Sequence, residues 1–408
     1  MQPLPEPLAR AVVPAGVRSV LEQLLASGHE GWLVGGGVRD LLLGHAPKDW
    51  DVATDAVPDQ ILTLFRRVIP TGIAHGTVTV LVPGGQVEVT TFRAESAYED
   101  GRRPGSVTFH RDLVADLARR DFTINALAFD PVGARFRDPF GGQEDLARRR
   151  VRCVGVAAER FGEDGLRPLR AVRFATVLAF ELDPETEAAI PGALGVFDKV
   201  ALERRRDELL KLLLSPGVVR GLDLLRRTGL MERLLPELAE VGDPERNTRV
   251  DRAVAVLEVR LAALLVAVAE ADRALERLRL PARTVETVRA LLAHPLPPDA
   301  STWGDAELRR WLVRLGPERW ELARALAAAT GADPDGEVGR RVAGIVAARP
   351  PLSAKELALN GAEIMKELGV GPSPAVGEAT RFLLDHVLER PDLNTPEQLR
   401  ELLRSRPS

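Results

Sequence analysis

The stretch WLVGGGVRDLLLGHAPKDWDVAT, residues 32–54, decides the fold. Leu33 and Val34 are typical of a buried strand, and the glycines at 35–37 predict a turn whose backbone N–H groups can approach a ligand closely. Residues 38–43 predict a short helix whose positive N-terminal end faces the same ligand. The sequence therefore predicts an anion site at the end of this strand.

Two acidic residues follow the predicted helix. Asp49 and Asp51 lie two positions apart in a strand-like segment, so strand alternation is expected to place both carboxylates on one face. Neighbouring carboxylates repel each other unless cations neutralise them, and Mg²⁺ prefers oxygen ligands. A phosphate-binding turn beside two such carboxylates is the arrangement that phosphoryl or nucleotidyl transfer requires.

Each of these signals has a simpler interpretation when it is taken alone. A glycine-rich turn between a strand and a helix is usually only a tight turn, and an Asp-x-Asp pair is more often a surface turn or a helix cap. The stretch contains no GxxxxGK[ST], and Asp40 replaces the last glycine of GxGxxG, which argues against P-loop and dinucleotide-binding sites. The combination of the glycines, the Arg39–Asp40 pair and the later aspartates favours a nucleotide site.

The composition is that of an ordinary globular protein. The chain has 408 residues, 45% hydrophobic and 28% charged, which is enough for two to four domains. With 55 Lys and Arg against 59 Asp and Glu, the net charge of −4 does not indicate nucleic-acid binding, so any RNA contact must come from local arginine clusters. Such clusters occur at residues 148–152, at residues 204–206 and at Arg167, Arg170 and Arg173.

Cysteine content and hydropathy bear on the compartment. The single cysteine, Cys153, excludes an internal disulfide and a cysteine-rich zinc site, and it fits a reducing environment. The first residues lack the pattern of a secretion signal, and no apolar run reaches about 18 residues. We therefore expect a cytoplasmic protein without a membrane segment.

The motifs GGGVRD and KDWDVAT together resemble the signature of the class II tRNA nucleotidyltransferases and bacterial poly(A) polymerases, in the polymerase-β nucleotidyltransferase superfamily. The resemblance implies that Gly35, Gly36 and Arg39 bind the nucleotide, and that Asp49 and Asp51 are catalytic and hold Mg²⁺. It implies an α+β fold: a polymerase-β-like nucleotidyltransferase head with a small mixed β-sheet, followed by an all-α neck, body and tail. The implied partners are tRNA, CTP and ATP.

Three β-like runs follow, at residues 68–70, 77–82 and 86–92. A Pro-Gly-Gly turn joins the last two and predicts a hairpin. In the third run Glu88 alternates with apolar neighbours and so lies on the opposite face from them. The resemblance makes Glu88 a candidate third catalytic carboxylate, whereas an exposed strand glutamate is the commoner interpretation without it.

Two segments bear on specificity within the family. HGTVTV, residues 75–80, is similar to the tRNA-adding branch rather than to the poly(A) polymerase branch, which carries an Arg-rich segment there. The polar residues 93–106 predict a long loop. In the family this loop helps to switch nucleotide choice from C to A, and enzymes that add only CC are shortened there. Its presence argues against a CC-only enzyme.

RRDFTINA, residues 119–126, resembles the ribose-binding motif of the family. The resemblance assigns Arg120, Asp121 and Asn125 to the nucleotide, and these side chains offer a cation, an acceptor and an amide for phosphate and sugar hydroxyls. Taken alone, the same residues also predict a capped helix start, with Asp121 or Thr123 as the cap.

EDGLRPLRAVRFA, residues 163–175, resembles the nucleobase-binding motif of the family. Asp164 and Arg167 are three apart, which predicts that they point to one side of a helix and can read the edge of a base. Without the resemblance, the pair would be interpreted as a surface ion pair. The resemblance adds Arg170 and Arg173 as nucleotide contacts.

Three further places in the helical part, with five residues in all, are informative. Pro168 removes a backbone donor, so the helix either begins later than the motif indicates or bends there. Glu203 and Arg204 precede an apolar stripe and resemble the helix-supporting motif of the family, so we interpret these charges as structural. Leu265 and Val266 stand where related enzymes carry an HD-type metal pair, so a second, hydrolase activity is not expected.

Strand signals fade after about residue 155, and four parts are predicted. These are a catalytic head (1–138), a neck that selects the nucleobase (139–215), a degenerate HD-like body (216–294) and a tRNA-binding tail (295–408). The predicted function is untemplated addition of CCA, or of its terminal A, to the 3′ end of tRNA. The alternatives are an enzyme restricted to the terminal A, a poly(A) polymerase, and an RNA-binding module with an inactive nucleotide fold; the oligomeric state stays open.

Overall fold

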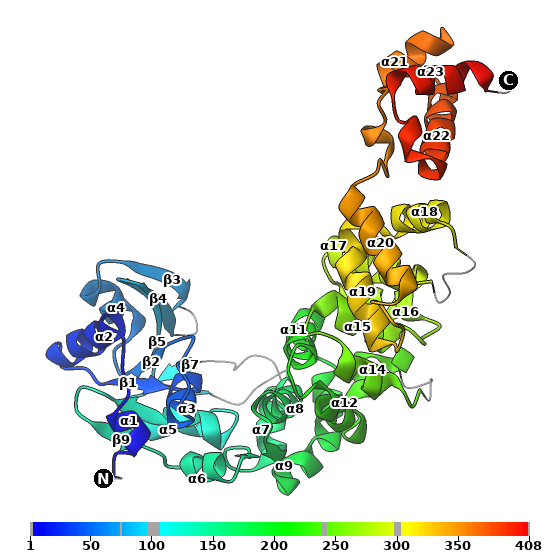
Figure 1. The fold of residues 1–408 in the computed structure, drawn as a ribbon. Coiled ribbons are helices and arrows are strands. Elements are labelled where there is room, and N and C mark those ends of the chain that lie inside the picture. Colours follow the sequence, from blue (N-terminus) through cyan, green and yellow to red (C-terminus); the bar gives the residue numbers. More distant parts are fainter. Residues whose placement is uncertain (1–2, 74–75, 96–106, 239–242, 298–302, 407–408) are drawn as a thin grey trace. The chain divides into compact units, whose positions relative to one another are not determined.

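The computed structural model describes residues 3–73, 76–95, 107–238, 243–297 and 303–406. The chain divides into two compact units, Met1–Pro236 and Glu237–Ser408. The first unit contains the β-sheet, and in the second unit the described residues form helices and their connections (Figure 1). This confirms the predicted α+β fold, with strands concentrated at the N-terminal end.

A mixed seven-stranded sheet, in the order β3-β4-β5-β2-β1-β8-β9, is the centre of the first unit. Its strands are β1 (Gly31–Val34), β2 (Asp51–Thr54), β3 (Val68–Gly72), β4 (Thr77–Val82), β5 (Gly85–Thr91), β8 (Ala128–Asp130) and β9 (Arg135–Arg137). β2 and β5 run parallel, whereas the other neighbouring pairs are antiparallel. The predicted hairpin is the β4–β5 pair, and Gly84 in its turn has φ of +85°.

Apolar side chains fix the inner strands of this sheet. All four residues of β1 are buried, which shows that both faces of the sheet are covered at this strand. Trp32 and Val34 of β1 pack with Phe92 and Leu117 in one hydrophobic cluster. Burial on both sides leaves little freedom for the register of β1, because a slip by one residue would invert every side chain.

Thirteen helices belong to the described part of the first unit. They are α1 (Glu6–Ala9), α2 (Ala15–Ala26), α3 (Gly36–Leu42), α4 (Pro58–Leu64), α5 (Leu113–Ala118), α6 (Gly142–Ala147), α7 (Ala157–Glu163), α8 (Arg167–Leu178), α9 (Pro184–Ala189), α10 (Leu194–Phe197), α11 (Leu202–Leu213), α12 (Val218–Arg227) and α13 (Leu230–Leu234). Helix α8 packs against both α11 and α12. Short 3-10 turns occur at η2 (Thr123–Asn125) and η3 (Pro191–Ala193).

Two small strand pairs lie outside the main sheet. β6 (Arg93–Glu95) pairs with β7 (Val107–Phe109), so the first three residues of the predicted loop form a strand. Residues 96–106 of that loop lie outside the described part. β10 (Arg150–Val151) pairs in parallel with β11 (Glu181–Leu182). The prediction that strands end near residue 155 is therefore wrong for β11.

The segment that resembles a nucleobase-binding helix forms two helices. Helix α7 ends at Glu163 and helix α8 begins at Arg167, with Pro168 in its first turn, where the missing N–H costs no hydrogen bond. Asp164 lies between the helices in an extended conformation. The prediction that Asp164 and Arg167 share one helix face is therefore wrong, and of the two expectations for Pro168 the later helix start is confirmed.

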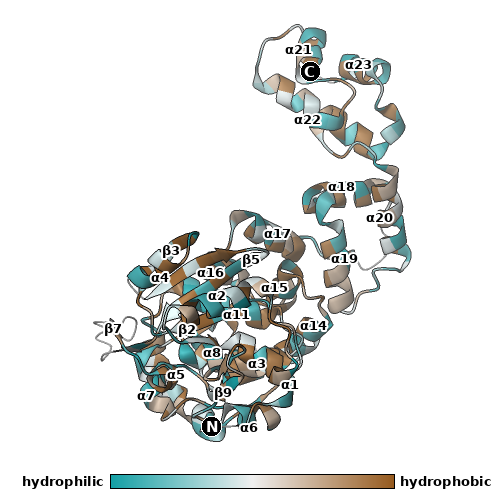
Figure 2. Ribbon diagram, turned by 90° about the vertical axis from the view of Figure 1, so that its left-hand side faces the viewer, coloured by the Kyte–Doolittle hydropathy of each residue, from teal (hydrophilic) through white to brown (hydrophobic). Residues whose placement is uncertain are grey.

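In its described part the second unit consists of helices. They are α14 (Arg246–Arg252), α15 (Leu257–Leu265), α16 (Ala271–Leu278), α17 (Ala282–Ala293), α18 (Asp305–Leu315), α19 (Trp320–Ala329), α20 (Glu337–Ala348), α21 (Gly361–Leu368), α22 (Pro374–Glu389) and α23 (Pro396–Ser405). Ile364, Leu383 and Leu399 bring α21, α22 and α23 together around one apolar cluster. Polar and apolar residues both occur along these helices (Figure 2), as expected of amphipathic packing.

No helix in the ranges given above is long and apolar enough to cross a membrane. The expected cytoplasmic location stays a prediction. So does the four-part division at residues 138, 215 and 294.

Gly142 tests how tightly the first unit is packed near η2. A Cβ at this position of α6 would lie 2.2 Å from the backbone oxygen of Thr123. We expect Gly142→Ala to lower the free energy of unfolding by about 1–3 kcal/mol, because the backbone must move to admit the methyl group. Gly162→Ala in α7 is the control: its Cβ would meet no atom within 4 Å, so its stability should stay equal or rise by up to about 1 kcal/mol in urea denaturation.

Candidate active site

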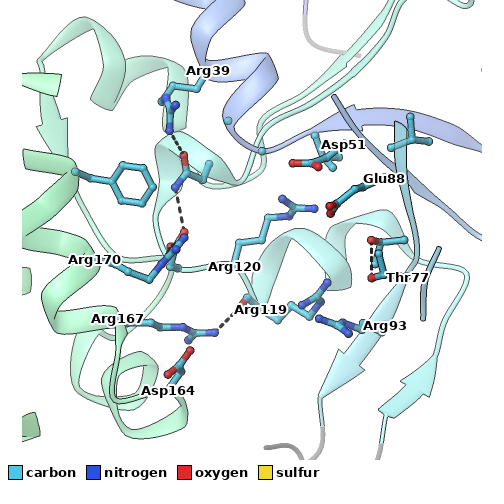
Figure 3. A pocket seen from close by; sticks show the side chains of 18 residues that line it. Arg39, Asp51, Thr77, Glu88, Arg93, Arg119, Arg120, Asp164, Arg167 and Arg170 are labelled. Carbon is cyan, nitrogen blue, oxygen red and sulfur yellow. Dashed lines mark hydrogen bonds and ion pairs between the residues drawn. The ribbon is translucent and has the colours of Figure 1, made fainter. Parts of the chain in front are cut away.

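Strand register brings the predicted site together. Val34, the last residue of β1, pairs with Asp51, the first residue of β2, and Asp51 pairs with Glu88 of β5. Gly35 follows Val34 directly, so the glycine turn, Asp51 and Glu88 lie in a row across three adjacent strands. The side chains of Asp51 and Glu88 point toward the same space (Figure 3).

The turn itself requires glycine. Gly35 has φ of +72°, and a Cβ there would lie 3.1 Å from Nη1 of Arg120 and 3.6 Å from Oδ2 of Asp51. Helix α3 begins at the next residue, so its N-terminal N–H groups are directed at the same place. The predicted anion-binding geometry is therefore present at this turn.

A cavity of about 450 Å³ opens at the turn, and we call it the arginine-lined cavity. The predicted residues that line it are Gly35, Gly36, Arg39, Asp51, Glu88, Arg120, Asp121, Asn125, Asp164, Arg167 and Arg170. Of the predicted set, Asp49 and Arg173 do not line it. The predicted lining residues thus converge on one space from three segments, namely the glycine turn and strands of the head, RRDFTINA and the α7–α8 segment (Figure 3). In the sequence they are spread from residue 35 to residue 170.

Asp49 lies outside the strand. It is in a bend before β2 and is exposed, so the alternation argument that placed it on the same strand face as Asp51 is wrong. The two residues are nevertheless close, because both line two further cavities beside the sheet. The negative charge of Asp49 also contributes to the raised pKa of Asp51.

The electrostatics of Asp51 show an unfavourable concentration of negative charge. Burial raises the pKa of the Asp51 carboxyl most, the charges of Glu88 and Asp49 raise it further, and Arg120 opposes the rise. The folded protein thus binds the proton of Asp51 more tightly than the unfolded chain does. A cation at this position would relieve the repulsion.

Arg120 connects this carboxylate group to the helical wall of the cavity. Its Nη2 donates to Oδ2 of the buried Asp116 over 3.2 Å. Its Nε is buried and has no hydrogen-bond partner among the residues that the structure describes. Arg120 therefore links Asp116 to the glycine turn, where its Nη1 would lie 3.1 Å from a Cβ on Gly35.

Asp121 is engaged by protein groups. Nε and Nη2 of Arg170 donate to its Oδ2 over 2.8 and 2.6 Å, and Nδ2 of Asn125 donates to its Oδ1 over 3.1 Å. Burial is the largest single effect and would raise the pKa of Asp121, but the charge and hydrogen bonds of Arg170, together with Asn125 and Arg167, lower it below its ordinary value. Asn125 in turn accepts from Nη1 of Arg39 over 2.9 Å. Asp121 therefore holds Arg170 and Asn125 in position.

The α7–α8 segment presents its charged groups in different ways. Oδ2 of Asp164 accepts from Nη2 of the half-exposed Arg204 over 2.9 Å. Arg167 is buried, and its guanidinium donates to the backbone oxygens of Arg119 and Arg160 and to the carboxylate of Glu163. Asp164 retains more capacity for a ligand, whereas Arg167 is largely fixed by the protein.

Arg173 supports an aromatic wall. It forms an ion pair with Glu208 of α11, and its guanidinium carbon lies 3.8 Å from the ring centroid of Phe174. Phe174 lines the arginine-lined cavity and packs edge-on against Phe122, with the ring centroids 5.6 Å apart. Arg173 therefore lies behind the aromatic ring instead of facing the cavity.

Sequence reasoning missed several residues of the cavity wall, namely Thr77, Thr90, Arg93, Arg119 and Phe174. Arg119 lies within RRDFTINA and Phe174 within EDGLRPLRAVRFA, so both could have been predicted as site residues from these two motifs. Thr77 and Thr90 are joined by their hydroxyls over 3.0 Å and pair across β4 and β5. Thr90 lies two residues after Glu88 in β5, so strand alternation alone indicates that the two share a face. Only the strand pairing reveals that Thr77 lies beside Thr90.

Comparisons with known proteins agree with this geometry. Residues 31–152 match the model of the poly A polymerase head domain, and residues 179–241 match that of a probable RNA and SrmB-binding site of polymerase A. A CCA-adding enzyme of Geobacillus stearothermophilus is 39% identical over 368 residues, 88% of this chain and 89% of that protein. One of Geobacillus sp. strain WCH70 is 37% identical over 390 residues, 94% of this chain and 95% of that protein.

The solved structures lead to the same relatives. The crystal structure of the Bacillus stearothermophilus CCA-adding enzyme in complex with CTP superposes with a TM-score of 0.82 at 35% identity. The match covers 95% of this chain and 96% of that one. The chain belongs to the family of CCA-adding enzymes. It is a nucleotidyltransferase with the polymerase head domain, and its family generally uses divalent metal ions.

The carboxylates at the site of this CCA-adding enzyme family member are suitable ligands for a divalent metal ion. Asp49, Asp51 and Glu88 offer hard oxygen donors, and the pKa of Asp51 is raised first by burial and then by the charge of Glu88. Within the described ranges, no group of three or more His, Cys, Asp or Glu side chains is arranged to hold a metal. Two protein carboxylates suffice if phosphates complete the coordination, as is usual for Mg²⁺.

The raised pKa of Asp51 yields a prediction about stability. Because the folded state favours protonated Asp51, this group lowers stability progressively as the pH rises above its ordinary pKa. We expect Asp51→Asn to raise the stability of the metal-free protein at neutral pH by about 0.5–2 kcal/mol, since the cost of burying the charge and the repulsion by Glu88 and Asp49 are both removed. Thermal unfolding in EDTA measures this change.

Glu22→Gln, on the exposed side of α2, is the control and should leave the Tm unchanged. Added Mg²⁺ should raise the Tm of the unmodified protein more than that of the Asp51→Asn variant. A lower Tm for Asp51→Asn in EDTA would contradict the electrostatic argument.

Proposed function

We propose that this protein adds CCA, or its terminal A, to the 3′ end of tRNA from CTP and ATP without a nucleic-acid template. The observation that carries the proposal is the register Val34–Asp51–Glu88, which aligns two carboxylates with a glycine turn inside the arginine-lined cavity. Family membership supplies the reaction class. The 3′ hydroxyl of the RNA would attack the α-phosphate of the nucleotide, and pyrophosphate would leave.

The number of guanidinium donors supports the binding of a triphosphate. Six arginines and four carboxylates line the cavity: Arg39, Arg93, Arg119, Arg120, Arg167 and Arg170 against Asp51, Glu88, Asp121 and Asp164. Three carboxylates behind this wall, Asp40, Asp116 and Glu163, pair with Arg39, with Arg119 and Arg120, and with Arg167, so the wall offers guanidinium donors rather than a net positive charge. These donors lie beside the N-terminus of α3, and together they favour phosphate oxygens. Gly35, Gly36, Arg39 and Arg120 would hold the triphosphate. Positioning and charge neutralisation would supply most of the acceleration.

Asp49 and Asp51 are the proposed Mg²⁺ ligands, and Glu88 is the proposed third catalytic carboxylate. Bound Mg²⁺ supplies Lewis-acid activation of the attacking hydroxyl and neutralises charge on the leaving pyrophosphate. The exposed Asp49 can adjust its position more easily than the half-buried Asp51. Asp51 would therefore fix the site, and Asp49 would complete it when ligands arrive.

The α7–α8 segment would select the base. Asp164 can accept a hydrogen bond from the amino group that cytosine and adenine share, and Arg167 would donate to ring nitrogen or carbonyl oxygen. Asp121 and Arg173 would act mainly through their partners, because Asp121 holds Arg170 and Asn125, and Arg173 supports Phe174. Phe174 would offer its ring to the nucleotide.

The alternatives receive less support. An enzyme that adds only the terminal A uses the same residues and differs in which tRNA end it accepts. Untemplated poly(A) synthesis is disfavoured by HGTVTV at residues 75–80. An inactive RNA-binding module is disfavoured because both aspartates of KDWD are present at the cavities.

Three labelled tRNAs test the proposal directly. The first tRNA lacks CCA, the second ends in C and the third ends in CC. Each is incubated with Mg²⁺ and one nucleotide at a time. CCA addition predicts C incorporation on the first two and A incorporation on the third. Extension of the third tRNA alone would identify the A-adding enzyme, long A tails would identify a poly(A) polymerase, and no extension would refute the proposal.

Asp49→Ala tests the metal assignment. We expect incorporation to fall at least about 100-fold, because positioned charge at the reacting phosphate contributes several kcal/mol. tRNA binding, measured by filter retention, should stay within about twofold, since phosphate contacts elsewhere dominate RNA affinity. Asp59→Ala, in the first turn of α4, is the control with retained activity. Loss of tRNA binding with unchanged turnover of bound tRNA would contradict the role of Asp49.

Asp164→Ala tests base selection. Removal of one hydrogen-bonding group typically changes base discrimination by about 1–3 kcal/mol, so the preference for CTP and ATP over UTP and GTP should fall about 5- to 150-fold. Competition between labelled nucleotides measures this ratio. Unchanged discrimination would remove Asp164 from the base-selecting role.

A further inference from the structure

Three cavities meet at Asp51, and the proposed nucleotide site accounts for one of them. Besides the arginine-lined cavity, a cavity of about 500 Å³ lies against the β4–β5 hairpin, and one of about 900 Å³ lies against α3 and the end of α8. We call them the hairpin cavity and the helix cavity. A transferase that joins two substrates needs a second binding space at the same carboxylates.

The hairpin cavity shares Asp51 and Glu88 with the arginine-lined cavity, and Asp49 also lines it. It contains no residue of the glycine turn at 35–37 and no arginine. The two cavities are thus open to the same pair of carboxylates, and only one of them reaches the anion-binding turn. The helix cavity lacks Glu88 and includes Gly36 and Arg39, so it adjoins the phosphate end.

The chemistry of the hairpin cavity does not suit a triphosphate. One lysine, Lys48, stands against the three carboxylates Asp49, Asp51 and Glu88, so the wall is negative overall. Trp50 adds an aromatic surface between the two aspartates. An uncharged ribose hydroxyl with a stacked base and one phosphate for Lys48 matches this set.

The reaction geometry favours the same occupant. In-line displacement requires the attacking hydroxyl and the leaving pyrophosphate on opposite sides of the α-phosphate. If the triphosphate lies along Gly36 and Arg39, the attacking group must arrive from the side of Glu88, away from the turn. Of the two remaining cavities, only the hairpin cavity includes Glu88.

Local packing fixes the wall of this cavity at its base. A Cβ on Gly16 in α2 would lie 2.8 Å from Cγ2 of Val82 and 3.0 Å from the backbone oxygen of Pro83, so helix and hairpin are in close contact. At the tip, a Cβ on Gly84 or Gly85 would meet no atom within 4 Å. The hairpin is therefore anchored on α2 and leaves open space at its turn.

We propose that the hairpin cavity receives the 3′-terminal nucleotide of the acceptor RNA strand, with its base stacked on Trp50. This inference rests on the proposed function and specifies where its second substrate binds. Trp50 would position the terminal nucleotide so that its hydroxyl lies between Asp51 and Glu88. Lys48 would contact the phosphate of that nucleotide.

Crosslinking locates the strand without requiring turnover. The probe is a minihelix RNA of the acceptor arm in which 4-thiouridine replaces the last C of a CC end. It is irradiated with the full-length protein in EDTA. Mass spectrometry should place the crosslink at Trp50 or at residues 82–86, which line the hairpin cavity and neither of the other two cavities. A crosslink at residues 177–180, which line the helix cavity, or at no residue of the hairpin cavity, would overturn the inference.

Kinetics with the unmodified minihelix and Mg²⁺ separate the two substrates. Trp50→Ala should raise the KM for the minihelix about 5- to 100-fold, because base–aromatic stacking contributes about 1–3 kcal/mol, and leave the KM for ATP within about twofold. Trp50→Phe should restore most of the loss. Val177→Ala, in the helix cavity alone, should leave both constants unchanged.

The outcomes distinguish this inference from the function on which it rests. If the unmodified protein extends no acceptor, the proposed function fails. If it extends the minihelix while Trp50→Ala changes the KM for ATP instead, or changes neither constant, only the assignment of the hairpin cavity fails.

Discussion

The pairing of Val34 with Asp51 and of Asp51 with Glu88 is the constraint on which the site depends. β1 and β2 are antiparallel, and β2 and β5 are parallel, so their ends near the cavity coincide at these three residues. A slip of one residue in β2 would turn Asp51 toward the core and bury an unpaired charge. The apolar residues of β1 thus fix catalytic geometry as well as stability.

The carboxylates of the site are neutralised to different extents on its two sides. On the helical side, carboxylates such as Asp121 and Glu208 are neutralised by arginines within the protein. Near the strands, Arg120 compensates the charge of Asp51 only in part, and the pKa of Asp51 is raised, first by burial and then by Glu88. The helical side is therefore complete without ligands, whereas the strand side becomes favourable when cations bind.

The same arrangement divides the proposed roles of the arginines. Arg39 and Arg170 are linked through Asn125 and Asp121, which joins the anion-binding helix α3 to the base-facing helix α8. Phosphate and base contacts are thereby held at a defined spacing. A rigid spacing of this kind suits a protein that must choose bases by its own side chains.

The sequence by itself determined the α+β fold, the glycine turn, the β4–β5 hairpin and most members of the arginine-lined cavity, because these follow from short-range patterns and recognisable motifs. It was wrong about Asp49, which lies in a bend before β2, and about Asp164 and Arg167, which an interhelical break separates. Local periodicity cannot reveal where an element begins when a proline or a bend intervenes.

Only the tertiary structure decided which residues meet. Strand pairing places Thr77 beside Thr90, and packing turns Arg173 behind Phe174 instead of into the cavity. The pairing of Asp121 with Arg170 joins residues 49 positions apart. Such contacts depend on how elements pack across the chain, and no short-range pattern in the sequence encodes them.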